Sequence, residues 1–374
     1  MVRAPLIGTL LGGPRGAVPD SIVISIDAMG GDHGPSVVAP GVALALERMR
    51  DRNVRFLLHG DQAQLTAALD KLPAAQAACD IRHTDLIISM DDKPAQALRR
   101  GKGSSLWNAV EAIRAGQAQA AVSGGNTGAL MAISKLILRM VSKDLDRPAI
   151  VASWPTMRGV TAVLDVGANV SADAAQLVEF AIMGEAFYRA VHGAVRPTVG
   201  LLNIGSEEQK GDDKVRGAHQ LLRDGGLQID YRGFVEGDDI AKGTVDVVVT
   251  DGFSGNVALK TAEGMALFFS ALLRETLTSD LRATVGAMIA RPALRRMRAR
   301  IDPATVNGGP LLGLNGIVVK SHGGANAVGF ANAVMIAADL ARSNFSTEIE
   351  RNIGNLADVI DKAGRAGQAT EAPK

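Results

Sequence analysis

Short apolar runs alternate with longer amphipathic segments along most of this 374-residue chain. The apolar runs predict buried strands at residues 22–27, 54–59, 120–122, 161–166, 198–203, 245–250 and 317–320. The segments between them predict helices at residues 36–50, 104–116, 127–142, 173–192, 213–224, 256–278 and 325–343. Because strands that alternate with helices of this length are typical of βαβ units, we predict an α/β fold in three layers, with helices on both faces of a mainly parallel sheet.

One stretch departs from this alternation. Residues 149–154 and 160–166 predict two strands that are joined by the short turn Met157-Arg158-Gly159. This pattern is typical of an antiparallel hairpin, here inserted into the parallel scheme. No internal repeat or linker divides the chain, so we predict a single domain over residues 21–345. Residues 1–20 are expected to form a disordered extension, and residues 346–374 a C-terminal helix with a frayed tail.

The composition excludes several classes of protein. Lys and Arg number 40 against 39 for Asp and Glu, which argues against a dedicated nucleic-acid binder. The single cysteine, Cys79, excludes an intramolecular disulfide and any CxxC motif, and its segment reads as helix surface or loop. No apolar run reaches about 18 residues, so no membrane span is predicted.

Glycine is concentrated where predicted strands end and helices begin. Six such junctions also carry Asn, Asp, Ser or Thr, and they cover residues 27–34, 123–128, 165–169, 203–211, 251–256 and 321–326. In a parallel sheet these loops would all emerge at one edge, so we expect them to surround a common crevice. Glycine lets backbone N–H groups approach an anion, and the following helix N-terminus adds positive partial charge. The pattern predicts an anion site at this edge, although ordinary turns and helix caps remain the alternative.

Several well-known motifs are missing from the sequence. It contains no GxGxxG fingerprint, no P-loop, no GxSxG elbow and no HExxH pair. The chain therefore offers an anion site without an evident nucleophile on the protein. That combination suits a reaction in which the bound anion is itself the nucleophile.

The junction motifs together resemble one family. They include Asp27-Ala-Met-Gly-Gly-Asp32, Ser123-Gly-Gly-Asn-Thr-Gly-Ala129 and Asp246-Val-Val-Val-Thr-Asp-Gly-Phe-Ser-Gly-Asn256, and the match runs in order over residues 22–345. The sequence resembles the acyl-acyl-carrier-protein:phosphate acyltransferases of bacterial phospholipid synthesis. One departure is Gly124, where that family's pattern has alanine.

The resemblance implies a reversible transfer of a long-chain acyl group from acyl carrier protein to inorganic phosphate, which gives acyl phosphate. A downstream membrane glycerol-3-phosphate acyltransferase would use that product. The resemblance also implies a fold like that of isocitrate and isopropylmalate dehydrogenases, a homodimer, no cofactor and no metal. It implies a cytoplasmic protein that is peripherally attached to the inner face of the cell membrane.

Candidate residues for this chemistry lie in the six junctions and next to them. Backbone amides are expected to hold phosphate, asparagine amides to stabilise the thioester oxyanion, and a histidine to protonate the leaving thiolate. The predicted catalytic residues are Asn126, Lys260, His322 and Asp251. The predicted phosphate- and substrate-binding residues are Asp27, Gly30, Gly31, Asp32, Gly124, Gly125, Thr127, Asn169, Asn203, Lys214 and Asn256. Asp27 and Asp251 end predicted strands, so they are equally well suited to capping loops.

A basic segment follows the last of the long helical patterns. Residues 281–301 contain six arginines and no acidic residue, with apolar residues mostly three or four apart. This spacing predicts a basic amphipathic helix that Pro292 kinks or splits. We expect Arg291, Arg295, Arg296 and Arg298 to dock an anionic membrane or the acidic carrier protein. A helix that faces the core with a solvated basic side is the alternative.

Two other functions remain open from the sequence. A decarboxylating dehydrogenase of similar fold would need a metal-binding set of aspartates and a nicotinamide site, and neither fingerprint is present. A non-catalytic adaptor would use the basic helix alone, and the many polar glycine loops argue against it.

Overall fold

A single sheet of eleven strands runs through the molecule, in the order β3-β2-β1-β4-β11-β10-β5-β6-β9-β7-β8. The computed structural model describes residues 21–143, 145–301, 307–343 and 345–354, so the predicted extension over residues 1–20 and the tail beyond residue 354 lie outside the described residues. The strands are β1 (Ile22–Asp27), β2 (Val54–Gly60), β3 (Cys79–His83), β4 (Ala120–Ser123), β5 (Ala149–Pro155), β6 (Val160–Leu164), β7 (Thr198–Leu202), β8 (Asp230–Val235), β9 (Val247–Val249), β10 (Gly309–Leu312) and β11 (Ile317–Lys320).

The predicted mainly parallel sheet is confirmed. Seven of the ten neighbouring strand pairs are parallel, and three are antiparallel. The predicted hairpin is also confirmed, because β5 and β6 pair antiparallel with Ala152 opposite Val163. Cys79 begins the edge strand β3, so its assignment to helix surface or loop is wrong.

The antiparallel pairs in the centre reverse the direction of the sheet. β10 runs against both β11 and β5, and β5 runs against β6. The strands β1, β2, β3, β4 and β11 therefore point one way, whereas β6, β7, β8 and β9 point the other way. The expectation that all six glycine junctions share one edge is wrong. Three of the junctions follow β1, β4 and β11, and the other three follow β6, β7 and β9, which point the opposite way.

The helices are α1 (Pro35–Arg48), α2 (Gln62–Leu69), α3 (Pro73–Ala78), α4 (Pro94–Arg100), α5 (Ser105–Arg114), α6 (Thr127–Leu138), α7 (Ala174–His192), α8 (Asp213–Asp224), α9 (Gly237–Lys242), α10 (Gly252–Leu277), α11 (Leu281–Ile301) and α12 (Ala327–Arg342). All seven predicted helices are present with small shifts at their ends. The short helices α2, α3, α4 and α9 were not predicted. Residues 345–354 are also helical and add Ile349 and Ile353 to the core.

Alternate residues of the strands pack against different helical layers. In β11, Val319 joins a core with α1 and α12, whereas its neighbour Val318 joins a core with α5 and α6. In β6, Leu164 packs with α7, and Val163 packs on the opposite face. This period of two confirms the predicted three-layer α/β/α arrangement, because side chains of a strand alternate between the two faces of its sheet.

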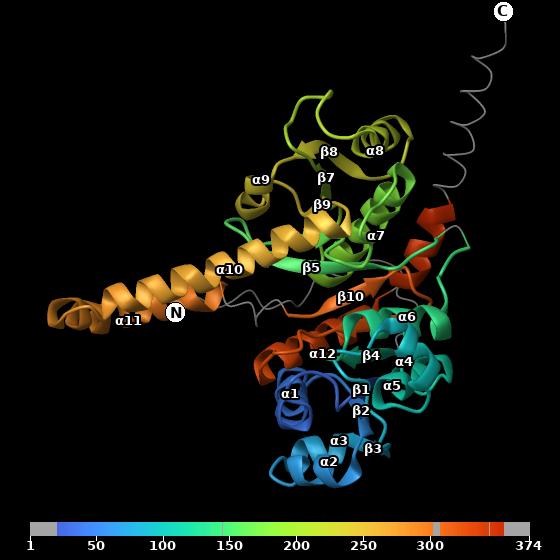
Figure 1. Cartoon of the computed structure of the whole chain (residues 1–374), viewed down its shortest axis with the longest axis vertical. Coiled ribbons are helices and arrows are strands. Elements are labelled where there is room, and N and C mark those ends of the chain that lie inside the picture. The colour runs from blue at the N-terminus through green and yellow to red at the C-terminus, as the bar shows by residue number, and fades with distance from the viewer. Residues whose placement is uncertain (1–20, 144, 302–306, 344, 355–374) are drawn as a thin grey trace, which may run out of the picture.

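Helices α10 and α11 leave these layers and form an arm that projects from the body (Figure 1). Within α10 only Gly252 and Gly255 are buried. Helix α11 continues through Pro292, so of the two predicted effects of this proline, a kink or a split, the split is wrong. No described side chain of α11 is buried, so the alternative of a core-facing helix is also wrong for these residues. None of the helices in the described part of the chain has the length and apolarity that a membrane span needs.

Candidate functional site

Three glycine-rich loops meet where β1, β4 and β11 end, and we call residues 27–34, 123–128 and 321–326 the first loop cluster. The amide of Asp32 donates to the carbonyl of Gly323 at 3.0 Å. A Cβ atom added to Gly30 would lie 2.8 Å from the backbone nitrogen of Gly125. Gly31 has a φ of +91° and lies close to the carbonyl of Gly323. The loops therefore approach each other backbone to backbone, as a site for a small anion requires.

Asp27 is the central acid of this cluster, and only 1% of its surface is exposed. Its Oδ2 accepts a hydrogen bond of 2.7 Å from Oγ of Ser123, the residue beside it on β4. Burial raises the pKa of Asp27, and interactions with Ser105, Ser123 and the backbone of Gly30 oppose part of that rise. Oδ1 is buried without a hydrogen-bond partner among the described residues. The buried Asp27 therefore holds together the loops after β1 and β4. Its carboxyl group favours the protonated form more than an exposed aspartate does.

Lys320 is a residue of this cluster that the sequence analysis missed. It is the last residue of β11 and lies in register with Ser123. Its Nζ donates to the carbonyl of Gly124 at 3.3 Å and to the carbonyl of Ser321. Burial lowers the pKa of Lys320 to about 8, although Asp27 and Asp32 act against that shift. The signal in the sequence was a lysine at the end of a buried strand, directly before a glycine loop.

Asn126 has all of its hydrogen-bonding groups engaged. Its Oδ1 accepts from the amide of Ala129 at 2.9 Å, which caps α6, and Thr127 is the first residue of that helix. Its Nδ2 donates to the carbonyls of Met90 at 2.7 Å and Asp92 at 2.9 Å. Asn126 therefore fastens the segment 89–92 over the first loop cluster.

His322 and His33 line a small pocket in the first loop cluster together with Gly124, Gly323 and other residues. The side chain of His322 is exposed, and its Nδ1 accepts from the amide of Gly324 at 3.1 Å. This bond leaves Nε2 as the ring nitrogen that is available to a ligand. His322 is thus placed beside the glycine backbone that the sequence analysis assigned to phosphate.

A second loop cluster joins residues 165–169 to residues 251–256 at the opposite edge of the sheet. Asp165 is fully buried and accepts hydrogen bonds from the amides of Ile150, Ala168 and Asn169. The side-chain amide of Asn169 donates to the carbonyl of Pro148 at 2.9 Å and to Asp165 at 3.0 Å. Asn169 therefore has both amide hydrogens engaged, which favours a structural role.

The remaining candidates lie around this edge. Asp251 caps α10 by accepting from the amide of Ser254 at 2.7 Å. Asn256 is exposed on the first turn of α10, next to Gly167. Asn203 closes its own loop by donating to the carbonyl of Lys210 at 3.2 Å, and Lys214 is exposed on the first turn of α8. The structure thus does not bring the predicted residues into one crevice.

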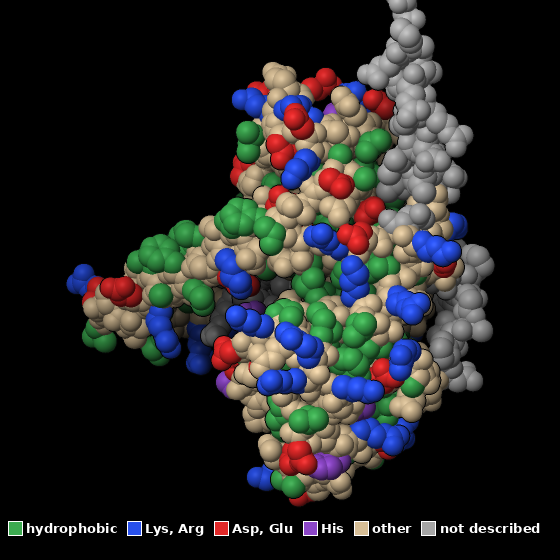
Figure 2. Space-filling view, turned by 45° about the vertical axis from the view of Figure 1, so that its right-hand side comes forward, with side chains coloured by type: hydrophobic (Ala, Val, Ile, Leu, Met, Phe, Trp, Pro, Cys, Tyr) green, Lys and Arg blue, Asp and Glu red, His purple; other side chains and the backbone are tan. Residues whose placement is uncertain are grey.

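Lys260 lies on α10, which begins in the second loop cluster, and its charge acts on Lys320 in the first. It is exposed on α10 and pairs with Glu263 at 2.7 Å. The positive charge of Lys260 contributes to lowering the pKa of Lys320, so α10 carries a second cation toward the first loop cluster. Figure 2 shows further Lys and Arg side chains on the body below the arm, and apolar side chains along the arm. We therefore take the first loop cluster with Lys260 as the candidate site.

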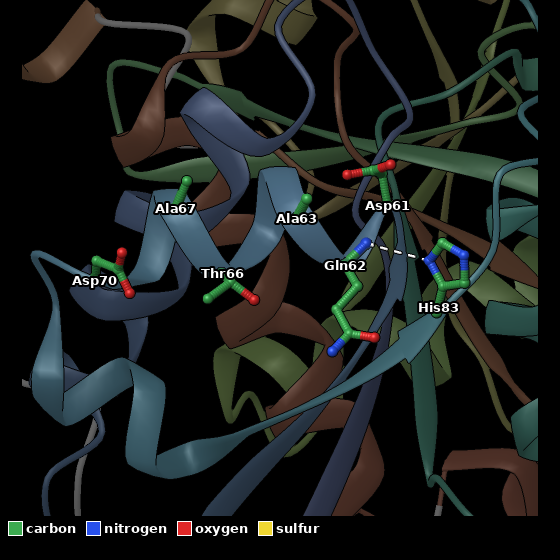
Figure 3. A pocket seen from close by; sticks show the side chains of 7 residues that line it. All are labelled: Asp61, Gln62, Ala63, Thr66, Ala67, Asp70 and His83. Carbon is green, nitrogen blue, oxygen red and sulfur yellow. Dashed lines mark hydrogen bonds between the residues drawn. The ribbon is translucent and has the colours of Figure 1, made fainter.

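A shallow, open pocket lies elsewhere, on α2 and the end of β3 (Figure 3). Figure 3 marks a hydrogen bond of 3.3 Å from the amide of Gln62 to Nδ1 of His83. None of the predicted site residues lines it. No group of three His, Cys, Asp or Glu side chains in the described ranges is arranged to hold a metal ion.

Solved structures resemble the protein in fold. A phosphotransacetylase from Streptococcus pyogenes superimposes with a TM-score of 0.58 at 17% identity, over 87% of this chain and 95% of that one. A branched-chain phosphotransacylase from Enterococcus faecalis V583 gives a TM-score of 0.51 at 13% identity, over 86% and 99% of the two chains. At these identities the likeness concerns the fold alone.

Sequence relatives are much closer. The protein is 68% identical over 336 residues to a phosphate acyltransferase from Caulobacter vibrioides, which covers 90% of this chain and 92% of the relative. A phosphate acyltransferase from Phenylobacterium zucineum is 60% identical over 92% of this chain and 97% of its own. The family described as fatty acid synthesis protein matches residues 22–348. The chain therefore belongs to this family of fatty acid synthesis proteins, together with relatives named phosphate acyltransferase, and it is an acyltransferase.

Proposed function

We propose that the protein transfers a long-chain acyl group reversibly from acyl carrier protein to inorganic phosphate, and so forms acyl phosphate for phospholipid synthesis. The first loop cluster is the observation that carries this proposal. Its glycine-rich loops pack backbone to backbone at the ends of three parallel strands, and Lys260 adds a positive charge nearby. The nearby hydroxyl of Ser123 is buried, donates to Asp27 and accepts from the amide of Gly125, so bound phosphate is better suited than this side chain to act as nucleophile.

The reaction needs positioning more than activation. Phosphate is already anionic near neutral pH, so an oxygen of bound phosphate attacks the thioester carbonyl carbon while the C–S bond breaks. The carbonyl oxygen gains negative charge on the way and needs N–H donors, a role suited to backbone amides of the first loop cluster. The carrier leaves as a thiolate, and Nε2 of His322 is available to give it a proton.

Apolar side chains beside the loops suit the acyl chain. Leu86 and Ile87 are exposed just before the segment 89–92 that Asn126 fastens, and Met90 is exposed within it. The methyl carbon of Met90 lies 3.1 Å from the position of a Cβ on Gly323, so this apolar surface reaches the first loop cluster. Beside the second loop cluster, the exposed Phe253 is the second residue of α10. The acyl chain is therefore expected to lie against one of these two surfaces.

The arm supplies the surface for larger partners. Arg291, Arg295 and Arg296 are exposed on α11 next to the exposed Met288 and Ile289, a combination that suits an anionic membrane or an acidic carrier protein. The side chain of Arg298 lies outside the described residues. The proposal includes a cytoplasmic location at the inner face of the cell membrane, where a downstream glycerol-3-phosphate acyltransferase takes up the acyl phosphate.

A homodimer is part of the same proposal. Leu267, Phe268 and Phe269 lie in the middle of α10 and are each more than half exposed. Such a run of large apolar side chains on a projecting helix is suited to burial against a second copy of the chain.

One assay tests the reaction. The protein is incubated with palmitoyl-acyl carrier protein and inorganic phosphate, and release of the carrier thiol is followed with and without phosphate. We expect thiol release only with phosphate, together with acyl phosphate that hydroxylamine traps. A change in nicotinamide absorbance instead would favour the dehydrogenase alternative, and binding of the carrier without turnover would favour the adaptor.

A further inference from the structure

We infer that Lys320 is a binding residue for the attacking phosphate, held in place by the carbonyls of Gly124 and Ser321. This inference rests on the proposed function, because it assigns a ligand within the same site. Lys320 is the last residue of the strand β11 and does not belong to one of the glycine loops.

The position of Lys320 is fixed by the pairing of three parallel strands. Lys320 of β11 pairs in register with Ser123 of β4, and Ser123 pairs with Asp27 of β1. All three residues end their strands, so Lys320 lies within the first loop cluster and not at its rim.

The hydrogen bonds of Lys320 leave room for a ligand. An ammonium group has three N–H donors and no acceptor. Two donors face the carbonyls of Gly124 and Ser321, which orient the group without neutralising its charge. Lys320 forms no ion pair with any described carboxylate, whereas the neighbouring cation Lys260 pairs with Glu263. One donor and an unpaired charge therefore remain for an anion.

The charges around Lys320 favour an added anion. Asp27 acts on it from β1, Asp32 from the following loop and Lys260 from α10. Asp27 has a raised pKa and already accepts a hydrogen bond from Ser123, so it neutralises the positive charge of Lys320 poorly. Lys260 repels it. A phosphate bound between Lys320 and Lys260 would relieve this repulsion and would hold Lys320 protonated.

A purely structural role is the competing explanation. The bond to Gly124 ties the loop after β4 to the loop after β11, and this tie would persist without any ligand. The two roles differ in what they do to the KM for phosphate relative to the KM for the acyl donor, and in the pH dependence of phosphate binding.

The test compares Lys320→Met and Lys320→Arg with wild type, with Lys71→Met as the control, since Lys71 is exposed in the turn after α2. We expect Lys320→Met to raise the KM for phosphate roughly ten- to a hundredfold, the value of a hydrogen bond to a charged group. The KM for acyl-acyl carrier protein should stay near that of wild type. Lys320→Arg should recover part of the phosphate affinity, and Lys71→Met should change neither constant.

Phosphate binding without an acyl donor separates this inference from the proposed function. Protection against thermal unfolding by inorganic phosphate is measured from pH 7.5 to 9.5, where phosphate is largely a dianion. Wild type should lose affinity as pH rises through about 8 and above, because Lys320 then loses its proton. Acyl transfer could fail while phosphate still protects wild type, but not Lys320→Met, against thermal unfolding. In that case the inference about Lys320 stands and the proposed reaction is wrong. Equal protection of wild type and a folded Lys320→Met, or of Lys320→Gln if the first variant does not fold, overturns the inference.

Discussion

Oγ of Ser123 donates a hydrogen bond of 2.7 Å to Oδ2 of Asp27, and the two residues end neighbouring parallel strands. This pair holds a carboxyl group inside the protein that would be far better solvated outside it. The cost of burying that group, rather than a strong counter-charge, dominates its behaviour.

Replacing Asp27 should therefore change how stability depends on pH. The pKa of Asp27 is raised above its value in the unfolded chain, 3.8, so its favourable contribution is complete below that pH and is lost as pH rises through the folded pKa. Asp27→Asn keeps an oxygen for Ser123 but cannot ionise. We expect the variant to gain stability relative to wild type between pH 4 and pH 8, measured by urea unfolding. A difference that is constant across this range would contradict the raised pKa.

Asn126→Ala should reduce activity more than stability. Loss of the N-cap alone costs about 1 kcal/mol. Because Asn126 also fastens the segment 89–92, we expect the rate of acyl phosphate formation to fall at least about tenfold, which corresponds to ~1.4 kcal/mol in the barrier. Asp61→Ala removes the matching cap of α2 and serves as the control. Equal rates in the two folded variants would refute a special role for Asn126.

Lys260→Ala should lower the rate and also move its pH dependence. We expect a loss of at least about tenfold in rate, from a missing positive charge near the phosphate. Lys260 helps to lower the pKa of Lys320, so its removal should shift the alkaline limit of phosphate binding to higher pH. Glu263→Gln keeps Lys260 but removes its ion-pair partner, and it should retain activity. A Lys260→Ala enzyme with the wild-type rate and profile would rule out this assignment.

Met90→Asp should discriminate between acyl donors by length. Placing a charge on the apolar surface beside Gly323 should penalise a long acyl chain, which needs that surface, more than a two-carbon chain. The ratio of rates with palmitoyl and acetyl donors is the measurement. Val195→Asp, at a side chain that is 89% exposed outside the site, is the matched control. An unchanged ratio in Met90→Asp would leave the surface at the start of α10 as the place of the chain.

Charge reversal on the arm should weaken docking without affecting chemistry. We expect Arg295→Glu with Arg296→Glu to reduce binding to vesicles that contain phosphatidylglycerol, to acyl carrier protein, or to both, because attraction to an anionic partner becomes repulsion. Flotation and carrier pull-down are the measurements, with Arg50→Glu, at an exposed residue just after α1, as the control. Unchanged binding of both partners would exclude this surface.

Local pattern was sufficient to predict most of the fold. Strand β1 and helix α7 were visible because their apolar residues are continuous or regularly spaced. Strand β3 was missed because Asp80, Arg82 and His83 give an edge strand little apolar character. Strand β10 was missed because Pro310 is unusual in a strand, and its pairing with β5 joins segments far apart in the chain. That pairing contributes to the reversal of strand direction in the sheet. The local pattern therefore could not predict that three glycine loops lie at one edge of the sheet and three at the other.

The site was predictable as a set of loops but not residue by residue. Asn169 and Asn256 are chemically identical in the sequence, yet one is buried against Pro148 and the other is exposed on α10. Which way an asparagine points depends on long-range packing. Lys320 escaped notice for a related reason, since a lysine at a strand end usually reaches into solvent.

The close approach at Gly30 limits how this enzyme can be altered. A methyl group there would meet Oδ2 of Asp27 at 2.3 Å and the nitrogen of Gly125 at 2.8 Å. Even alanine would force two loops apart, so laboratory evolution of the loop backbone by single substitutions should yield mostly inactive clones. New acceptors or donors are more accessible through libraries at partly exposed rim positions such as Met90, which is 42% exposed.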